Sequence, residues 1–333
     1  MTARRIGELD VVRGFALCGI HAVNVYQLVV LPELYPEGIG YGTDELPALI
    51  RHGFHQRFLP IFTLLFGVSF GIFLLRAGDR TRRPRLVLAR RLVTLAALGA
   101  LHQLVHPGEV LLVYAVMGLL MLLPGSFLGG SWAVAVGAVL LLIGGQFIPA
   151  YGVMPGLLLI GFGLAALRVP EGMSRRPGRV ALAFIVSAVA AGGYLLAVGN
   201  GIPVPSLSLG WISLTGQLAA LCSGLAYTTG LVLLLRTPLA PVLHRVLAPM
   251  GRMSLSNYLA ATALILLGAP PLGIDGFDDA PAIAVLVVGI IALEAVWSTL
   301  WLRRFRYGPA EWAWRCVTWW QVVDIRRDTP RTA

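Results

Sequence analysis

Residues 132–148, WAVAVGAVLLLIGGQFI, and residues 283–296, IAVLVVGIIALEAV, decide the fold class. Both are long apolar runs without the in/out alternation that the strands of a membrane barrel require. Of the 333 residues, 57% are hydrophobic and 13% are charged, and the mean hydropathy is +0.79, which is too apolar for an ordinary soluble domain. The sequence therefore predicts an all-α, polytopic bundle of transmembrane helices.

The number of spans follows from the apolar runs and the residues that break them. A crossing needs ~20 apolar residues, so about ten crossings fill most of the chain and leave short loops. The third to sixth spans are the shortest runs, and eight or nine crossings remain compatible with the sequence. The expected starts lie near Leu9, Phe54, Leu92, Glu109, Trp132, Val153, Val180, Trp211, Met253 and Pro281.

Arginine placement predicts the orientation, because short positively charged loops stay in the cytoplasm. With both termini cytoplasmic, the basic stretches all fall inside: 76–91, 168–179, 236–252 and 303–331. The outer loops collect acids instead, namely Glu33, Glu37, Asp44, Glu45, Asp275, Asp278 and Asp279. Two parts are predicted: a membrane bundle, residues 1–302, and a cytoplasmic juxtamembrane tail, residues 303–333, whose tryptophans and arginines favour a helix in the headgroup layer.

The formal net charge of +10 does not indicate a nucleic-acid partner, because the arginines lie between apolar runs rather than on one face of a domain. The three cysteines are an odd number, and neither a disulfide framework nor a metal-ligand spacing is visible. We therefore expect no metal site.

The first span carries several polar residues at membrane depth, where ionisable groups are expensive and are functional candidates. Asp10, Arg13, His21 and Asn24 fall on one helix face and are expected to point at one cavity. Asp10 and Arg13 are three residues apart and suitably spaced for an ion pair. The alternative is a structural ion pair and a hydrogen-bonded core histidine.

The third span places His102 and His106 four residues apart on one face, followed closely by Glu109. A neutral imidazole near a carboxylate accepts a proton and keeps it, because the carboxylate stabilises the imidazolium. This pattern predicts a general base. A histidine that only packs in the core is the alternative.

Three further groups are candidates. Arg57 opens the second span, as an interfacial cap or as part of a site that receives a substrate. Glu294, without an identified partner in the tenth span, is expected to be protonated or to reach the membrane surface. On the ninth span, Asn257 and Tyr258 share one face with Ser254 and suit either a site or interhelical hydrogen bonds.

Five stretches follow one another from end to end of the chain: RIGELDVVRGFALCGIHAVN, FLPIFTLLFGVSFG, ARRLVTLAALGALHQLVHPGEVLLVYAVMGLL, GRMSLSNYL and RFRYGPAEWAWR. Together and in this order they resemble the YeiB family of bacterial membrane proteins. The chain departs from the family pattern at Glu109, where an Asp is expected, and this moves the carboxylate by about one methylene.

The resemblance implies membership of the transmembrane acyltransferases, which include acyltransferase-3 proteins and the lysosomal heparan-α-glucosaminide N-acetyltransferase. It implies a place in the bacterial cytoplasmic membrane and an acyl-CoA co-substrate, in the simplest case acetyl-CoA. The residues that match the family's motifs are expected in the pocket: Arg13, Asn24, His102, Glu109, Tyr114, Arg252, Asn257 and Tyr258.

The leading hypothesis is an acyltransferase that moves an acyl group from acyl-CoA to a hydroxyl or amine of a small molecule or sugar. His102 would be the base, oriented by Glu109, and cytoplasmic arginines would bind the CoA phosphates. These arginines are Arg252, Arg303, Arg304 and Arg306. The alternative is a proton-coupled transporter of small molecules or lipids, with a relay through Asp10, Arg13, His21 and His102. Membrane lipids are the expected surroundings, and a homodimer is compatible with either hypothesis.

Overall fold

The computed structural model describes residues 7–30, 50–54, 57–148, 151–173, 176–205, 213–274, 276 and 279–327. This part of the chain is helical, apart from turns and one isolated bridge between Phe305 and Arg326, and the all-α prediction is confirmed. The longer helices are α1 (Gly7–Val25), α3 (Phe58–Gly78), α4 (Pro84–His102), α5 (Leu111–Met117), α7 (Gly130–Phe147), α8 (Met154–Ala166), α10 (Pro177–Gly199), α11 (Leu214–Leu234), α12 (Ala240–Arg252), α13 (Ser254–Gly268), α14 (Ala280–Arg304) and α15 (Pro309–Trp319).

Short segments complete the helical part. α6 (Leu123–Gly125) continues α5 after a π-helical turn, Gly118–Leu122, and α9 (Val169–Met173) follows α8. Further π turns are Tyr26–Val30 and Ile50–Phe54, and a 3₁₀ turn is Pro270–Leu272.

Within the described residues, five helices are long and apolar enough to cross a membrane: α3, α7, α10, α11 and α14. A helix also begins near nine of the ten starts expected from the sequence, although several of these helices are shorter or carry more charge. The third begins earlier than expected, at Pro84 instead of near Leu92, because proline at the first helical turn is tolerated there. The number of crossings and the orientation of the termini stay predictions.

Two basic stretches are helical rather than loops. Residues 240–252 form α12, with Pro249 inside it, and residues 309–319 of the tail form α15. The acids Glu33, Glu37, Asp44, Glu45, Asp275 and Asp278 lie outside the described residues, so the acidic outer loops are not described.

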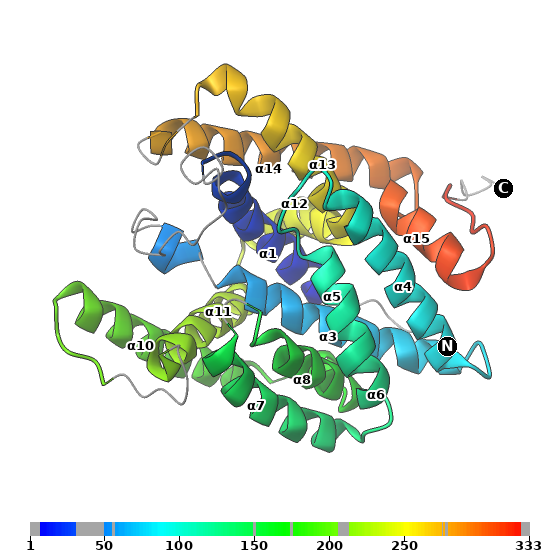
Figure 1. Cartoon of the computed structure of the whole chain (residues 1–333), viewed down its shortest axis with the longest axis horizontal. Helices are drawn as coiled ribbons and strands as arrows, with labels where there is room; N and C mark the ends of the chain where they lie inside the picture. Colours follow the sequence, from blue (N-terminus) through cyan, green and yellow to red (C-terminus); the bar gives the residue numbers. More distant parts are fainter. Residues whose placement is uncertain are drawn as a thin grey trace.

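α1 lies at the centre of the bundle that builds the candidate site (Figure 1). It packs against α3, α12, α13 and α14, while α4 packs against α5 and α15. The close approach of α1 and α12 depends on two glycines, because a Cβ at Gly14 would clash with Leu247 O and a Cβ at Gly251 with Asp10 O. α8 packs against α3 and α7 packs against α8, while α10 and α11 form a hairpin at the edge (Figure 1).

Candidate functional site

His102 and Glu109 meet where α4 turns into α5. Gly108 has φ +77°, a conformation that glycine adopts without strain, and the turn brings Glu109 to the start of α5. The Glu109 carboxylate accepts hydrogen bonds from the backbone N–H of Leu111 (2.7 Å) and of Leu112 (2.8 Å). His102 Nδ1 lies 3.5 Å from Glu109 Oε2, close enough for charge stabilisation but long for a hydrogen bond. The Glu109 carboxylate therefore caps α5 and at the same time faces the His102 imidazole.

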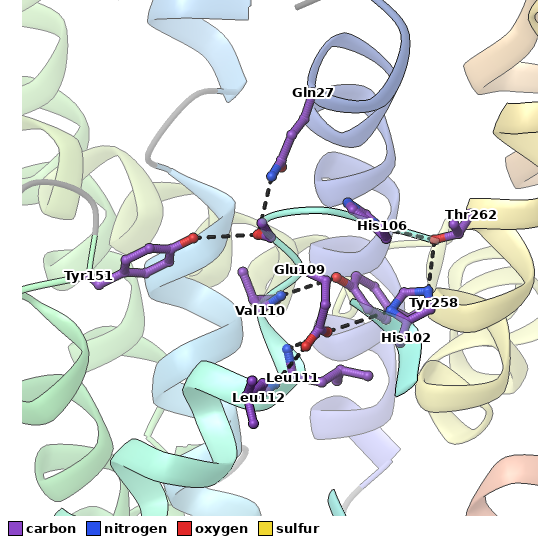
Figure 2. A network of polar contacts seen from close by, with 11 residues as sticks. Gln27, His102, His106, Glu109, Val110, Leu111, Leu112, Tyr151, Tyr258 and Thr262 are labelled. Atoms are coloured by element: carbon purple, nitrogen blue, oxygen red, sulfur yellow. Dashed lines mark hydrogen bonds and ion pairs between the residues drawn. The ribbon is translucent and has the colours of Figure 1, made fainter. Parts of the chain in front are cut away.

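Thr262, on α13, connects the two histidines (Figure 2). Its hydroxyl lies 3.1 Å from His102 Nε2 and 2.9 Å from His106 Nδ1. All three side chains are buried. Because a hydroxyl carries one proton, it can donate to only one ring, and at least one of the two ring nitrogens must donate to it, so the tautomers of His102 and His106 are linked.

A cavity of about 160 Å³ lies beside this cluster. Tyr258 lines it, and the edge of the His102 ring packs against the Tyr258 ring with centroids 5.4 Å apart. The Tyr258 hydroxyl accepts a hydrogen bond from Val110 N at 3.4 Å, which also lines the cavity. Neither His102 nor Glu109 lines the cavity itself, so Tyr258 and Val110 form the wall between the cavity and the histidine cluster.

Three arginines from three helices line the same cavity. Arg13 donates to Asp10 Oδ1 (3.2 Å), Gly251 O (3.2 Å) and Ser69 Oγ (2.8 Å), which confirms the proximity of Asp10 and Arg13 expected from the sequence. Arg252 donates to the Arg306 carbonyl at 3.3 Å. Arg91, the third, lies under the ring of a tail tryptophan. The cavity therefore combines cationic groups with an apolar wall, formed by Ile20, Phe62, Leu65, Phe66, Phe70 and Leu95 among others.

The tail helix α15 contributes Glu311 and Trp314 to the cavity wall. Glu311 accepts hydrogen bonds from Leu255 N (2.7 Å), Ser256 N (3.2 Å) and the Ser256 hydroxyl, and so caps α13 from another helix. Burial raises the pKa of Glu311, and these hydrogen bonds oppose the rise. The sequence analysis missed both residues. Glu311 and Trp314 are three residues apart and therefore share one helix face. A single acid on a face with aromatic residues is the pattern that could have indicated them in the sequence.

Two expected pocket residues of α1 form a separate buried cluster. His21 Nε2 lies 2.8 Å from Glu294 Oε2, and both side chains are completely buried. The interpretation of Glu294 as an acid without a partner is therefore wrong. Asn24, one turn further along α1, is also buried, and none of these three lines the cavity.

The remaining expected residues lie outside the cavity. Tyr114 is buried behind its wall and shares a hydrogen bond with Thr63 at 2.8 Å. Asn257 bonds to Ser298 (3.0 Å) and Trp297 (2.7 Å), and thus ties α13 to α14. Arg57 is buried at the start of α3, and Arg304 is exposed at the end of α14. No group of three potential metal ligands occurs among the described residues.

The fold and site place the chain among all-helical proteins that have several membrane-length helices and a cavity lined by arginines and apolar side chains. The chain is 32% identical to an uncharacterized 39.9 kDa protein of Bacillus acidopullulyticus, over 95% of this chain and 94% of that one. It is 26% identical to YxaH of Bacillus subtilis, over 97% of each. It is also 26% identical to YeiB of Escherichia coli, over 93% of this chain and 95% of that one. Residues 165–321 match DUF418, a family described as of unknown function.

The chain therefore belongs to this YeiB-like family of bacterial proteins. No solved structure matches it. The DUF418 match covers Arg252, Tyr258, Thr262 and the tail helix, whereas His102 and Glu109 come from the preceding half. The candidate site is thus assembled from both halves of the chain.

Proposed function

We propose that the protein is a membrane-embedded acyltransferase that moves an acyl group from acyl-CoA to a hydroxyl or amine. The observation that carries this proposal is the cavity, whose lining includes both the three arginines and Tyr258, the ring that packs against His102. The motifs resemble the YeiB family, and the grouping of that family with the transmembrane acyltransferases supports the same reaction. The acyl group, in the simplest case acetyl, lies along the apolar wall.

Arginines would bind the CoA phosphates, because guanidinium groups bind phosphate oxygens through paired, charge-assisted hydrogen bonds. Arg252 lines the cavity, and Arg303 and Arg304 are exposed at the end of α14. The proposal includes a multi-pass chain of about ten spans in the bacterial cytoplasmic membrane, with both termini and these three arginines on the cytoplasmic side. A small molecule or sugar would be the acceptor.

His102 acts as the general base in this proposal. The acceptor hydroxyl or amine attacks the thioester carbonyl carbon while its proton passes to the imidazole. The Glu109 carboxylate, 3.5 Å from His102 Nδ1, stabilises the imidazolium. The tetrahedral intermediate then collapses, the C–S bond breaks, and CoA leaves as a thiolate that takes up a proton from bulk water. Because Tyr258 and Val110 separate the cavity from His102, a shift of this wall is part of the catalytic cycle.

The test is release of the CoA thiol from acetyl-CoA by the protein in lipid nanodiscs, with simple sugars and amines as acceptors. We expect release that is lost in His102→Ala and kept in His244→Ala, since His244 lies on α12 outside the cavity. Full release by His102→Ala would reject His102 as the base. A protein that neither releases CoA nor binds acyl-CoA in a thermal-shift assay would contradict acyl transfer.

Proton-coupled transport is the second candidate, and the His21–Glu294 pair favours it. A completely buried, hydrogen-bonded histidine and carboxylate at 2.8 Å form a protonatable unit inside the bundle. Transport predicts pH-dependent uptake into sealed vesicles that depends on His21, with no CoA released.

A further inference from the structure

The hydroxyl of Thr262 has an unusual position among the buried threonines of the helices. Thr63, Thr229 and Thr318 donate to the backbone carbonyl four residues earlier, with O···O distances of 2.6 to 2.7 Å. Thr262 makes no such backbone bond in the described structure, and its hydroxyl bonds to the two imidazoles instead. The Thr262 hydroxyl therefore bonds to the two histidines instead of to the backbone of its own helix.

Water is largely excluded from this chain of three groups. The exposed fractions are 7% for His102, 3% for Thr262 and 1% for His106. A proton that reaches His102 must therefore leave through a neighbouring side chain or return the way it came. The hydroxyl of Thr262, bonded to both rings, is the group positioned to accept it.

We propose that His102, Thr262 and His106 form a proton relay. His102 takes up a proton at Nδ1, the nitrogen that faces Glu109. The imidazolium then gives its Nε2 proton to the Thr262 oxygen, while Thr262 gives its own hydroxyl proton to His106 Nδ1. One N–H and one O–H bond break and one O–H and one N–H bond form, so a single proton moves and no oxidant or further reactant is required.

His106 is the last group of the relay, and its surroundings indicate where the proton leaves. His106 Nε2 has no hydrogen-bond partner in the described structure, and His106 lies in the turn between α4 and α5 with the exposed residues Gln103, Leu104 and Val105. The titratable groups packed against the relay are Glu109, which faces His102, and Tyr258, whose ring contacts both histidines.

The relay receives its proton from the proposed acyl transfer, so this part of the inference rests on the proposed function. The hydrogen-bonded linkage of the two rings through Thr262 is independent of that function. The linkage is tested by ¹⁵N NMR of the histidines in nanodiscs, for Thr262→Val, Thr262→Ser and the control Thr229→Val. Valine has the shape of threonine without the hydroxyl, and serine keeps the hydroxyl. We expect Thr262→Val to shift the Nε2 signal of His102 and the Nδ1 signal of His106 together, while the other two variants leave both in place. Unmoved signals in Thr262→Val would overturn the relay.

Turnover tests the transfer itself. In His102-dependent CoA release, Thr262→Val is expected to lower kcat at least ~10-fold with little change in KM, and Thr262→Ser to restore it. Added imidazole is expected to restore part of the activity of His106→Ala, which a purely structural histidine would not show. Full kcat in Thr262→Val would overturn the relay while acyl transfer stands. Wild-type protein without His102-dependent release would contradict acyl transfer, and the relay would then be judged by the NMR signals alone.

Discussion

Arg91 and Trp314 hold the tail helix to the bundle through two contacts. The Arg91 guanidinium lies 3.6 Å from the centroid of the Trp314 ring, and Trp314 Nε1 donates to the Arg91 carbonyl oxygen at 2.8 Å. One residue of α4 therefore supplies both a cation for the indole face and an acceptor for the indole N–H. Since both residues line the cavity, the same pair fixes part of its wall.

Trp314→Ala is expected to lower the free energy of unfolding by about 2 kcal/mol or more, through loss of the cation–π contact, the hydrogen bond and apolar burial. Trp320→Ala is the matched control, because Trp320 is 76% exposed and its ring is 5.0 Å from the Arg90 guanidinium. Thermal unfolding followed by tryptophan fluorescence compares the two. An equal decrease in the free energy of unfolding for Trp314→Ala and Trp320→Ala would contradict the expected contribution of the Trp314 contacts.

Gly251→Ala is expected to destabilise the protein by about 1–3 kcal/mol, because the new methyl group would clash with Asp10 O and force α12 away from α1. The displacement would also move the Gly251 carbonyl away from Arg13. Gly289→Ala is the control, since a Cβ there meets no atom within 4 Å and alanine favours the helix. The melting temperatures of the two variants in nanodiscs are expected to change in opposite directions.

Glu294→Leu is expected to cost about 3–5 kcal/mol, because it leaves His21 buried without its partner. The double variant His21→Leu/Glu294→Leu is expected to recover much of this loss, since two apolar residues replace two buried polar ones. A double-mutant cycle on unfolding free energies measures the coupling. Strictly additive losses would mean that the two side chains do not stabilise each other.

The sequence predicted the helices and the contacts within single spans well. The pairs Asp10–Arg13 and His102–Glu109 are close in the chain, so helical periodicity and one turn determine which side chains meet. Contacts between distant spans were not predictable in this way. Apolar runs show that helices exist but not which faces adjoin, because lipid and neighbouring helices are equally apolar surroundings.

Glu294 and Thr262 illustrate this limit. Glu294 is 273 residues from His21, and Thr262 is 160 residues from His102. Their partners follow from the packing of α14 on α1 and of α13 beside the end of α4. A lone acid in an apolar run was therefore assigned no partner, and a threonine in such a run gave no signal at all.

The cap that Glu311 places on α13 also has a consequence for the order of synthesis. The backbone amides of Leu255 and Ser256 leave the ribosome more than fifty residues before the carboxylate that satisfies them. At ~5–20 residues per second, α13 waits for seconds with this end uncapped. A nascent chain that stops before residue 309 retains its long apolar helices but lacks one wall of the cavity. The pocket is therefore completed only after α15 has been synthesised and has packed against α13.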